Sequence, residues 1–157
     1  MSRHKFQGFT LVEILIVVVI MAVLAAVVVP QFAGSTDDAK KSTAEFNLGS
    51  LRSVVQTFRA HHEGVKPAFP SGATTIEALT KETNAAGAVT TGGGFGPYLV
   101  SIPENPFTGK STVAAVATAG TPPVSGDVTA NNQGGWIYDA STGNIWLDSN
   151  TQGEFAW

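Results

Sequence analysis

Hydrophobic residues dominate one long stretch near the start of the chain, "FTLVEILIVVVIMAVLAAVVV" from Phe9 to Val29. As a helix rising 1.5 Å per residue, this stretch spans roughly 31 Å, about the thickness of a bilayer hydrocarbon core. Arg3 and Lys5 precede the stretch, and the next Lys or Arg is Lys40. The positive-inside rule therefore predicts a membrane helix with a cytoplasmic N-terminus and the rest of the chain on the other side.

Beyond Pro30 the pattern becomes that of an amphipathic helix. Apolar residues recur at spacings of four and three at Ala44, Leu48, Leu51, Val55 and Phe58. This spacing places them on one helix face. Because proline normally kinks or ends a helix, and "STDD" resembles a helix start, two options remain: one long helix with a bend or melted turn, or two helices. Gly64 and Pro67 indicate where the helix stops.

The rest of the chain predicts short elements joined by loops rich in proline and glycine. "TTIEALTKET" predicts a short helix with a capping box formed by Thr74 and Glu77. A short strand is expected near Thr112–Val116, followed by a long exposed loop. "GGWIYDASTGNIWLDS" predicts a β-hairpin of Trp136–Tyr138 and Asn144–Leu147 with one side against the helix stripe.

Composition narrows the function classes. Charged residues make up 13% of the chain, the net charge is −3, and there is no cysteine. The basic residues are scattered, so nucleic acid is not expected as a main partner. The lack of cysteine excludes disulfides and Cys-ligated zinc. The residues outside the apolar stretch suffice for one modest domain.

Glu13 is the unusual residue of the apolar stretch. A charge at the bilayer centre costs roughly 2.5–3.5 kcal/mol on insertion scales, and less near an interface. A plain signal anchor that tolerates Glu13 near one end is therefore possible. A cleaved secretory signal fits less well, because its apolar region is usually only about 7–15 residues long.

The stretch "GFTLVEILIVVVIMAVLAAVVVPQF" resembles the N-terminus of type IV pilins and of the pseudopilins of type II secretion systems. The resemblance implies that prepilin peptidase cuts between Gly8 and Phe9, and that Phe9 is then N-methylated. It implies that Glu13, at the fifth mature position, pairs with the terminal amine of a neighbouring subunit and sets the register of a filament. Pro30 stands where many pilins carry a proline, and we expect it to kink the helix.

The resemblance also implies an α+β pilin fold, with one long helix from about Thr10 to His62 packed on a small C-terminal antiparallel β-sheet. The expected parts are a cleaved leader (1–8), a transmembrane and filament-core helix (9–29), its amphipathic continuation (30–63) and a periplasmic globular region (64–157). The segment "GPYLVSIPENPFTGK" and the ending "GGW-x-Y…TG-x-I" are similar to those of major pseudopilins.

The implied function is that of a filament subunit, single-pass in the inner membrane before assembly. The expected partners are other copies of the chain, prepilin peptidase, an assembly platform membrane protein, minor pilins or pseudopilins, and membrane lipid. A major pseudopilin is favoured, because the C-terminal disulfide loop common in pilins cannot form without cysteine. A type IV pilus pilin for adhesion, motility or DNA uptake is the alternative, and a membrane-anchored binding module or enzyme is a third class.

No catalytic residues are expected, because the sequence contains no paired carboxylates at useful spacing, no metal triad and no supported Ser-His-Asp set. His61 and His62 are adjacent and would point about 100° apart on a helix, so they are not expected to bind one ion. We expect both to be surface or capping histidines.

A calcium site is the remaining candidate for a cofactor. Major pseudopilins are associated with calcium in their C-terminal loops, and Asp139, Ser141, Thr142 and Asp148 offer oxygen ligands. Acidic residues are few here, however, and turn chemistry alone explains Asp139. We therefore expect no cofactor, with calcium as the alternative.

Overall fold

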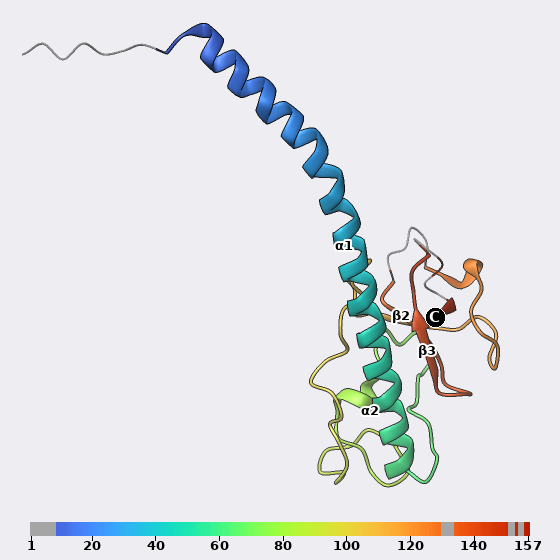
Figure 1. The fold of residues 1–157 in the computed structure, drawn as a ribbon. Helices are drawn as coiled ribbons and strands as arrows, with labels where there is room; N and C mark the ends of the chain where they lie inside the picture. The colour runs from blue at the N-terminus through green and yellow to red at the C-terminus, as the bar shows by residue number, and fades with distance from the viewer. Residues whose placement is uncertain (1–8, 130–133, 151–152, 154–155) are drawn as a thin grey trace, which may run out of the picture. The chain divides into compact units, whose positions relative to one another are not determined.

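The computed structural model describes residues 9–129, 134–150, 153 and 156–157, with the side chains of 29–35 left aside. The elements are the α-helices α1 (Leu11–His61) and α2 (Glu77–Thr80), the strands β1 (Val113–Ala115), β2 (Trp136–Asp139) and β3 (Asn144–Leu147), and the 3₁₀ helix η1 (Ser125–Asp127) (Figure 1). The chain divides into two compact units, Met1–Ala39 and Lys40–Trp157.

Helix α1 is one continuous α-helix of 51 residues that includes Pro30. The alternative of two separate helices is therefore wrong, whereas the kink at Pro30 stays a prediction because that side chain is not among those described. The helix ends as predicted before Gly64, whose φ of 89° is left-handed. The N–H of Gly64 donates a hydrogen bond of 2.8 Å to the carbonyl of Arg59, one of the last carbonyls of the helix.

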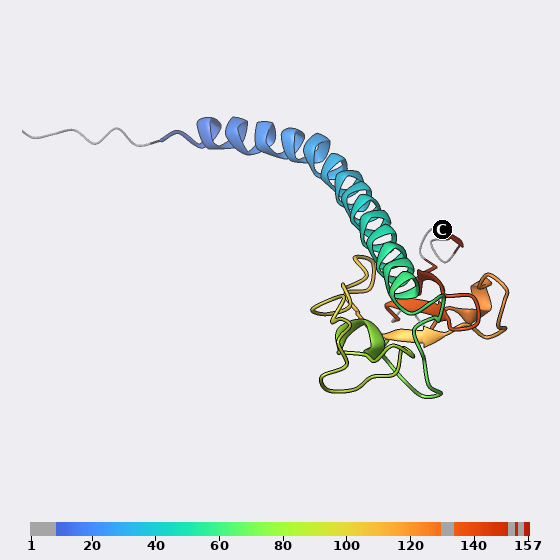
Figure 2. The ribbon, with the colours of Figure 1, turned by 90° about the horizontal axis from the view of Figure 1, so that it is seen from below.

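The second half of α1 packs on the sheet and on α2 (Figure 2). All five residues of the predicted stripe, from Ala44 to Phe58, are buried. They meet the buried residues Ile76, Leu79, Trp136, Tyr138, Ile145 and Leu147. Burying one large apolar side chain contributes about 1.5–3 kcal/mol, so this single cluster holds the Lys40–Trp157 unit together.

The sheet has three strands in the order β1-β2-β3. Strands β2 and β3 form the predicted antiparallel hairpin, with Trp136 opposite Leu147 and Asp139 opposite Asn144. Strand β1 pairs in parallel with β2, so the sheet is mixed rather than wholly antiparallel. A parallel pair needs a long connection, and residues 116–135 provide one. The α+β class with a long N-terminal helix and a small C-terminal sheet is confirmed.

The short helix α2 is real but smaller than predicted, and its predicted capping box is wrong. Ile76 is the N-cap residue, and no side chain caps the helix. The carbonyl of Thr74 instead accepts a hydrogen bond from Val113 N–H at 2.9 Å. This bond ties the chain before α2 to β1, so the helix begins only at Glu77.

The segment before β1 is fastened to the start of β2. Trp136 Nε1 donates to the carbonyl of Pro103 at 2.8 Å, and Asn105 Nδ2 donates to the carbonyl of Gly135 at 2.9 Å. A Cβ on Gly135 would lie 2.5 Å from the carbonyl oxygen of Thr112, and one on Gly134 would lie 1.5 Å from Oδ2 of Asp148. The neighbouring backbone therefore explains Gly135, and the side chain of Asp148 explains Gly134, in the "GGW" sequence.

Candidate processing and assembly site

The N-terminus of α1 brings together three of the residues singled out by sequence or geometry. Phe9 and Thr10 immediately precede the helix, and Glu13 lies in its first turn. Phe9 is 83% exposed, so it is accessible to another protein. Gly8, the residue before the predicted cut, lies outside the described residues.

Thr10 and Glu13 form a capping box. Glu13 Oε2 accepts hydrogen bonds from the backbone N–H and the hydroxyl of Thr10, both at 2.8 Å. The hydroxyl of Thr10 in turn accepts the N–H of Glu13 at 3.2 Å. These bonds satisfy N–H groups that have no partner within the helix, which fixes the start of α1 at the edge of the apolar segment. The sequence interpretation overlooked this role, although Thr-x-x-Glu before an apolar run is its signature.

The capping box also orients the carboxylate of Glu13. The group is held at the positive end of the helix dipole, where a negative charge is favoured. A carboxylate has about four acceptor sites, and the bonds to Thr10 involve only one of its oxygens. The other oxygen can therefore still bind a cation from another molecule.

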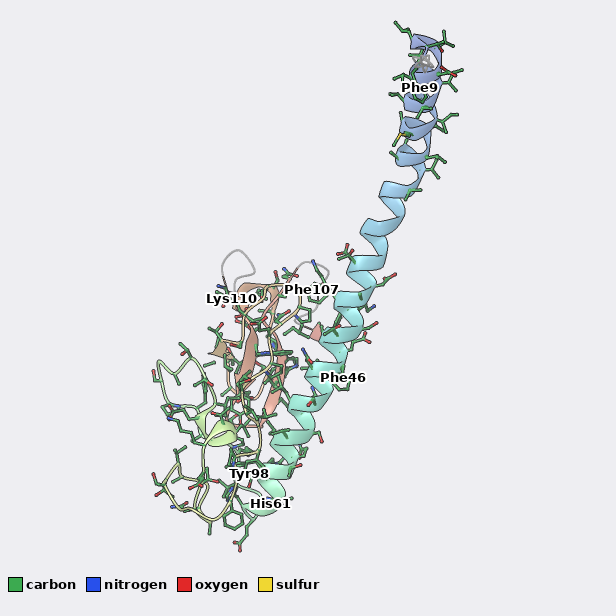
Figure 3. All side chains as sticks on the ribbon, turned by 90° about the vertical axis from the view of Figure 1, so that its left-hand side faces the viewer. Phe9, Phe46, His61, Tyr98, Phe107 and Lys110 are labelled. Atoms are coloured by element: carbon green, nitrogen blue, oxygen red, sulfur yellow. The ribbon has the colours of Figure 1, made fainter. Side chains whose placement is uncertain are left out.

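The helix that follows Glu13 is apolar on every side. The segment Leu11–Val28 is long and apolar enough to cross a membrane, and none of it is buried against the described chain. Its large side chains from Leu11 to Val28 are between 45% and 81% exposed. Figure 3 shows side chains projecting all around this part of α1, below the labelled Phe9. Such a surface requires lipid or other helices around it.

His61 and His62 behave differently from each other, and the prediction that both are surface or capping residues is wrong for His62. His62 is fully buried, and its Nε2 lies 3.1 Å from Thr83 Oγ1 and 3.2 Å from Tyr98 Oη. His61 is exposed, with Nδ1 3.1 Å from the same Tyr98 Oη (Figure 3). The two imidazoles therefore fasten the end of α1 to the Tyr98 segment instead of sharing a metal ion.

The four candidate calcium ligands do not converge. Asp139 and Asp148 lie toward opposite ends of the hairpin, because Asp139 faces Asn144 while Asp148 follows Leu147. Four residues at 3.4 Å each separate the two carboxylates by roughly 14 Å, whereas calcium ligands lie about 2.3–2.6 Å from the ion. In the described part of the chain, no three His, Cys, Asp or Glu residues are grouped as metal ligands.

Each of these carboxylates also has protein donors. Asp139 accepts hydrogen bonds at 2.8 Å from Ser141 N–H, Thr142 Oγ1 and Gly120 N–H. Burial by itself would raise the pKa of Asp139, but the hydrogen bonds from Ser141, Gly120 and Thr142 outweigh it and lower the pKa to about 2. Asp148 accepts the backbone N–H and the hydroxyl of Thr129. The residues present therefore fit hydrogen-bonded turns and do not fit a calcium cage.

Comparison with known proteins found a family motif and several similar proteins. The family described as "Prokaryotic N-terminal methylation motif" matches residues 3–29. The type II secretion system core protein G of Pseudomonas aeruginosa is 31% identical over 144 residues, which cover 92% of this chain and 98% of the relative. The same-named protein of Vibrio cholerae is 32% identical over 107 residues, 68% of each chain.

A pilus protein is also similar over a shorter region. The major component of the type IV narrow pilus of Thermus thermophilus is 33% identical over 61 residues, 39% of this chain and 53% of the relative. No solved structure matches the chain significantly. Because the similarity to the Pseudomonas aeruginosa protein extends over nearly the whole length of both chains, the chain belongs to the type II secretion system core protein G family.

Proposed function

We propose that this chain is the major pseudopilin of a type II secretion system, a structural subunit that assembles from the inner membrane into a pilus-like filament and has no enzymatic activity. The observation that carries the proposal is the N-terminus of α1, where Glu13 caps an apolar helix that nothing in the described chain covers. Lipid covers this helix before assembly, and other subunits cover it afterwards.

Processing precedes assembly. Prepilin peptidase cuts between Gly8 and Phe9 on the cytoplasmic side, and the new amine of Phe9 is methylated. Arg3 and Lys5 support a cytoplasmic N-terminus and a periplasmic Lys40–Trp157 unit. Cleavage creates a positively charged amine on Phe9, four residues before Glu13. Only processed subunits therefore carry the cation that can pair with the carboxylate of Glu13.

The pairing of these charges sets the register of the filament. An unpaired carboxylate in an apolar bundle is costly, while one paired with a cation is tolerated. The amine of Phe9 on one subunit binds the carboxylate of Glu13 on its neighbour, and other staggers leave both charges unpaired. An assembly platform membrane protein and minor pseudopilins are the further partners of this process, and nucleic acid is not a partner of the monomer.

Intact-mass spectrometry of the protein extracted from membranes tests the processing step. The expected mass lacks Met1–Gly8 and carries one added methyl group, whereas a full-length mass would contradict the proposal. Unprocessed protein from cells without prepilin peptidase is the matched control.

A type IV pilus subunit is the second candidate, supported by the similarity to the Thermus thermophilus pilus component. Deleting the chromosomal copy separates the two functions. A pseudopilin deletion blocks release of secreted proteins and leaves surface pili in place, whereas a pilin deletion removes the pili and leaves secretion intact.

A further inference from the structure

A cleft of about 510 Å³ opens on the surface of the Lys40–Trp157 unit, and we call it the Glu77 cleft. Its apolar walls come from the segment before α2, from α2 itself and from the loop after it: Ala68, Pro70, Ala73, Ala78, Gly87 and Val89. Among the described residues that line the cleft, Glu77 alone is charged. The lining therefore fits an apolar group that has a cation beside it.

The carboxylate of Glu77 can accept a second cation. Its Oε1 lies 2.7 Å from Nζ of Lys81, in a pair whose side chains are both 53% exposed. Such a pair on a helix surface contributes little in water. Oε2 of Glu77 accepts no hydrogen bond from the described residues, and Lys81 does not line the cleft.

The Glu77 cleft lies at the end of the unit where α1 finishes. A Cβ on Gly87 would lie 3.2 Å from Cζ of Phe58 and 3.2 Å from Cγ1 of Val65. Phe58 belongs to the last turn of α1, and Val65 follows the helix by four residues. In Figure 3 this is the end at which His61 is labelled.

A firmly held turn lies elsewhere on the unit, at residues 105–110, and we call it the Phe107 turn. The N–H of Asn105 donates to the carbonyl of Lys110 at 2.8 Å, and the N–H of Gly109 donates to the carbonyl of Asn105 at 2.7 Å. The hydroxyl of Thr108 donates to the carbonyl of Gly134 at 2.7 Å. These bonds fix the direction in which the turn presents its remaining side chains.

The Phe107 turn lies at the opposite end of the unit, where α1 enters it (Figure 3). Phe107 is half-buried with its ring 6.2 Å from that of Trp157, and Nζ of Lys41 lies 5.4 Å from the centre of the Trp157 ring. Lys41 precedes Phe58 by 17 residues on α1, which is roughly 26 Å along the helix. Lys110 is exposed and has no ion-pair partner among the described residues.

The turn and the cleft match in chemistry and in placement. The turn offers an aromatic ring with a lysine three residues later, and the cleft offers apolar walls with one carboxylate. Because the two lie at opposite ends of the unit, a turn can reach the cleft of another copy but not its own. A contact between unlike ends does not close on itself, so it can repeat along a linear array.

We infer that the Phe107 turn docks into the Glu77 cleft of a second copy of this chain, with Phe107 against the apolar walls and Lys110 paired with Glu77. This contact rests on the proposed filament function, since subunits of one filament share one polarity and so face each other with unlike ends. It joins the Lys40–Trp157 units directly, separately from the charge pair of Phe9 and Glu13.

The first test places a charge in the cleft of the full-length chain in cells, with sheared filaments measured against membrane-bound subunit. Val89→Asp is expected to lower the filament yield by about tenfold, because burying an unpaired charge costs more than the energy of a tenfold change. Val124 is also exposed but lies outside the cleft, so Val124→Asp is the matched control and should stay within about twofold of wild type. Unchanged thermal unfolding of both variants shows that the fold survives.

The second test reverses the charges across the contact. Lys110→Glu is expected to lower the filament yield by about threefold, because two carboxylates then face each other. Combining Lys110→Glu with Glu77→Lys and Lys81→Glu restores opposite charges across the contact and keeps a reversed pair within α2. We expect this combination to return the yield to within about twofold of wild type. A yield that stays low would contradict the pairing of Lys110 with Glu77.

The third test uses the absence of cysteine in the chain. Lys110→Cys is combined with Glu77→Cys or with Ala88→Cys, another residue that lines the cleft, and assembled filaments are treated with a short bis-maleimide. We expect cross-linked multimers for at least one pair. Thr57→Cys, exposed on α1 and outside the cleft, replaces the cleft cysteine in the control and should give none.

The outcomes separate this contact from the function on which it rests. If wild-type chains form filaments while Val89→Asp and Lys110→Glu assemble equally well and no cleft pair cross-links, the contact is wrong and the filament function stands. Cross-linking of Lys110→Cys to itself would also overturn the contact, because like ends would then meet. If wild-type chains form no filaments, the proposed function fails and the contact fails with it.

Discussion

Glu13 combines an observed local role with a proposed intermolecular one. Its hydrogen bonds with Thr10 begin α1, and its charge is proposed to recognise the amine of a neighbouring Phe9. Glutamine can accept the same capping bond without the charge. Glu13→Gln therefore separates the two roles, since it preserves the helix start while removing the ion pair.

We predict that Glu13→Gln lowers the filament yield by about tenfold, because the neutral side chain no longer pairs with the amine of Phe9 and no longer favours the correct stagger between subunits. Thr10→Ala keeps the charge and the backbone donor, so it should assemble close to the wild-type level even though losing a cap costs helices about 1 kcal/mol. Filament yield in sheared fractions is the measurement. Wild-type assembly of Glu13→Gln would show that the charge is dispensable.

Asp139 stabilises the turn between β2 and β3 and the loop that contains Gly120. Its pKa is lowered from 3.8 to about 2 in the folded protein, so the folded state binds this proton less well than the unfolded state. The ionised carboxylate of Asp139 therefore contributes its full share to the free energy of unfolding above about pH 4. This share is lost as the pH falls through about 2.

We predict that Asp139→Asn lowers the free energy of unfolding by about 2 kcal/mol at pH 7, and that the difference from wild type shrinks as the pH falls toward 2. Denaturant titrations of both proteins at pH 7 and pH 3 measure this. Glu104→Gln, at an exposed carboxylate, is the control for losing one negative charge. A difference that does not change with pH would contradict the assigned cause.

At the scale of elements, the hairpin depends on close packing at Gly134, which lies just before β2 against the side chain of Asp148. We predict that Gly134→Ala destabilises the protein by about 1–3 kcal/mol, because the new methyl group overlaps the carboxylate of Asp148 and overpacked sites cost this much. Gly126→Ala, where a Cβ meets nothing within 4 Å, should change stability little. Thermal unfolding followed by circular dichroism compares the two variants, and equal melting temperatures would refute the prediction.

The elements that could be predicted from sequence are those with a regular pattern. The stripe from Ala44 to Phe58 predicted the buried face of α1, and strand composition with a turn predicted the β2–β3 hairpin. His62 continues the same stripe four residues after Phe58. Because histidine is polar, its burial against Thr83 and Tyr98 was not predicted.

The features that the sequence did not predict depend on contacts between residues far apart in the chain. The pattern Thr-x-x-Glu forms a capping box at Thr10 but not at Thr74. At Thr74 the backbone carbonyl instead accepts a hydrogen bond from Val113, which keeps this residue out of the helix. The direction of β1 was equally hidden, since a long connection permits either orientation. At the candidate site, the spacing from Gly8 to Glu13 predicts the processing and register residues, which stay predictions. The capping box of Thr10 and Glu13 has a sequence signature of its own, Thr-x-x-Glu before an apolar run, so it too could have been predicted.

At the scale of the whole molecule, the Lys40–Trp157 unit has no disulfide, so packing and hydrogen bonds hold it together. The buried cluster of α1, α2 and the sheet lies in one unit, and Arg52 adds hydrogen bonds from its guanidinium to the carbonyls of Ile145 and Trp157. Packing and hydrogen bonds of this kind need no ion. The candidate calcium ligands are divided between the two ends of the hairpin, so the four of them do not form one cage.

We therefore propose that the protein is stable without calcium, and predict the same melting temperature, within about 1 °C, in EDTA and in millimolar calcium. An ion that bound only the folded state would raise the melting temperature as its concentration rose, because binding shifts the folding equilibrium by mass action. A rise of several degrees with calcium would contradict the prediction. Repeating the titration with Asp139→Asn and with Asp148→Asn would then identify the carboxylate responsible, since only the variant lacking a ligand should lose the response.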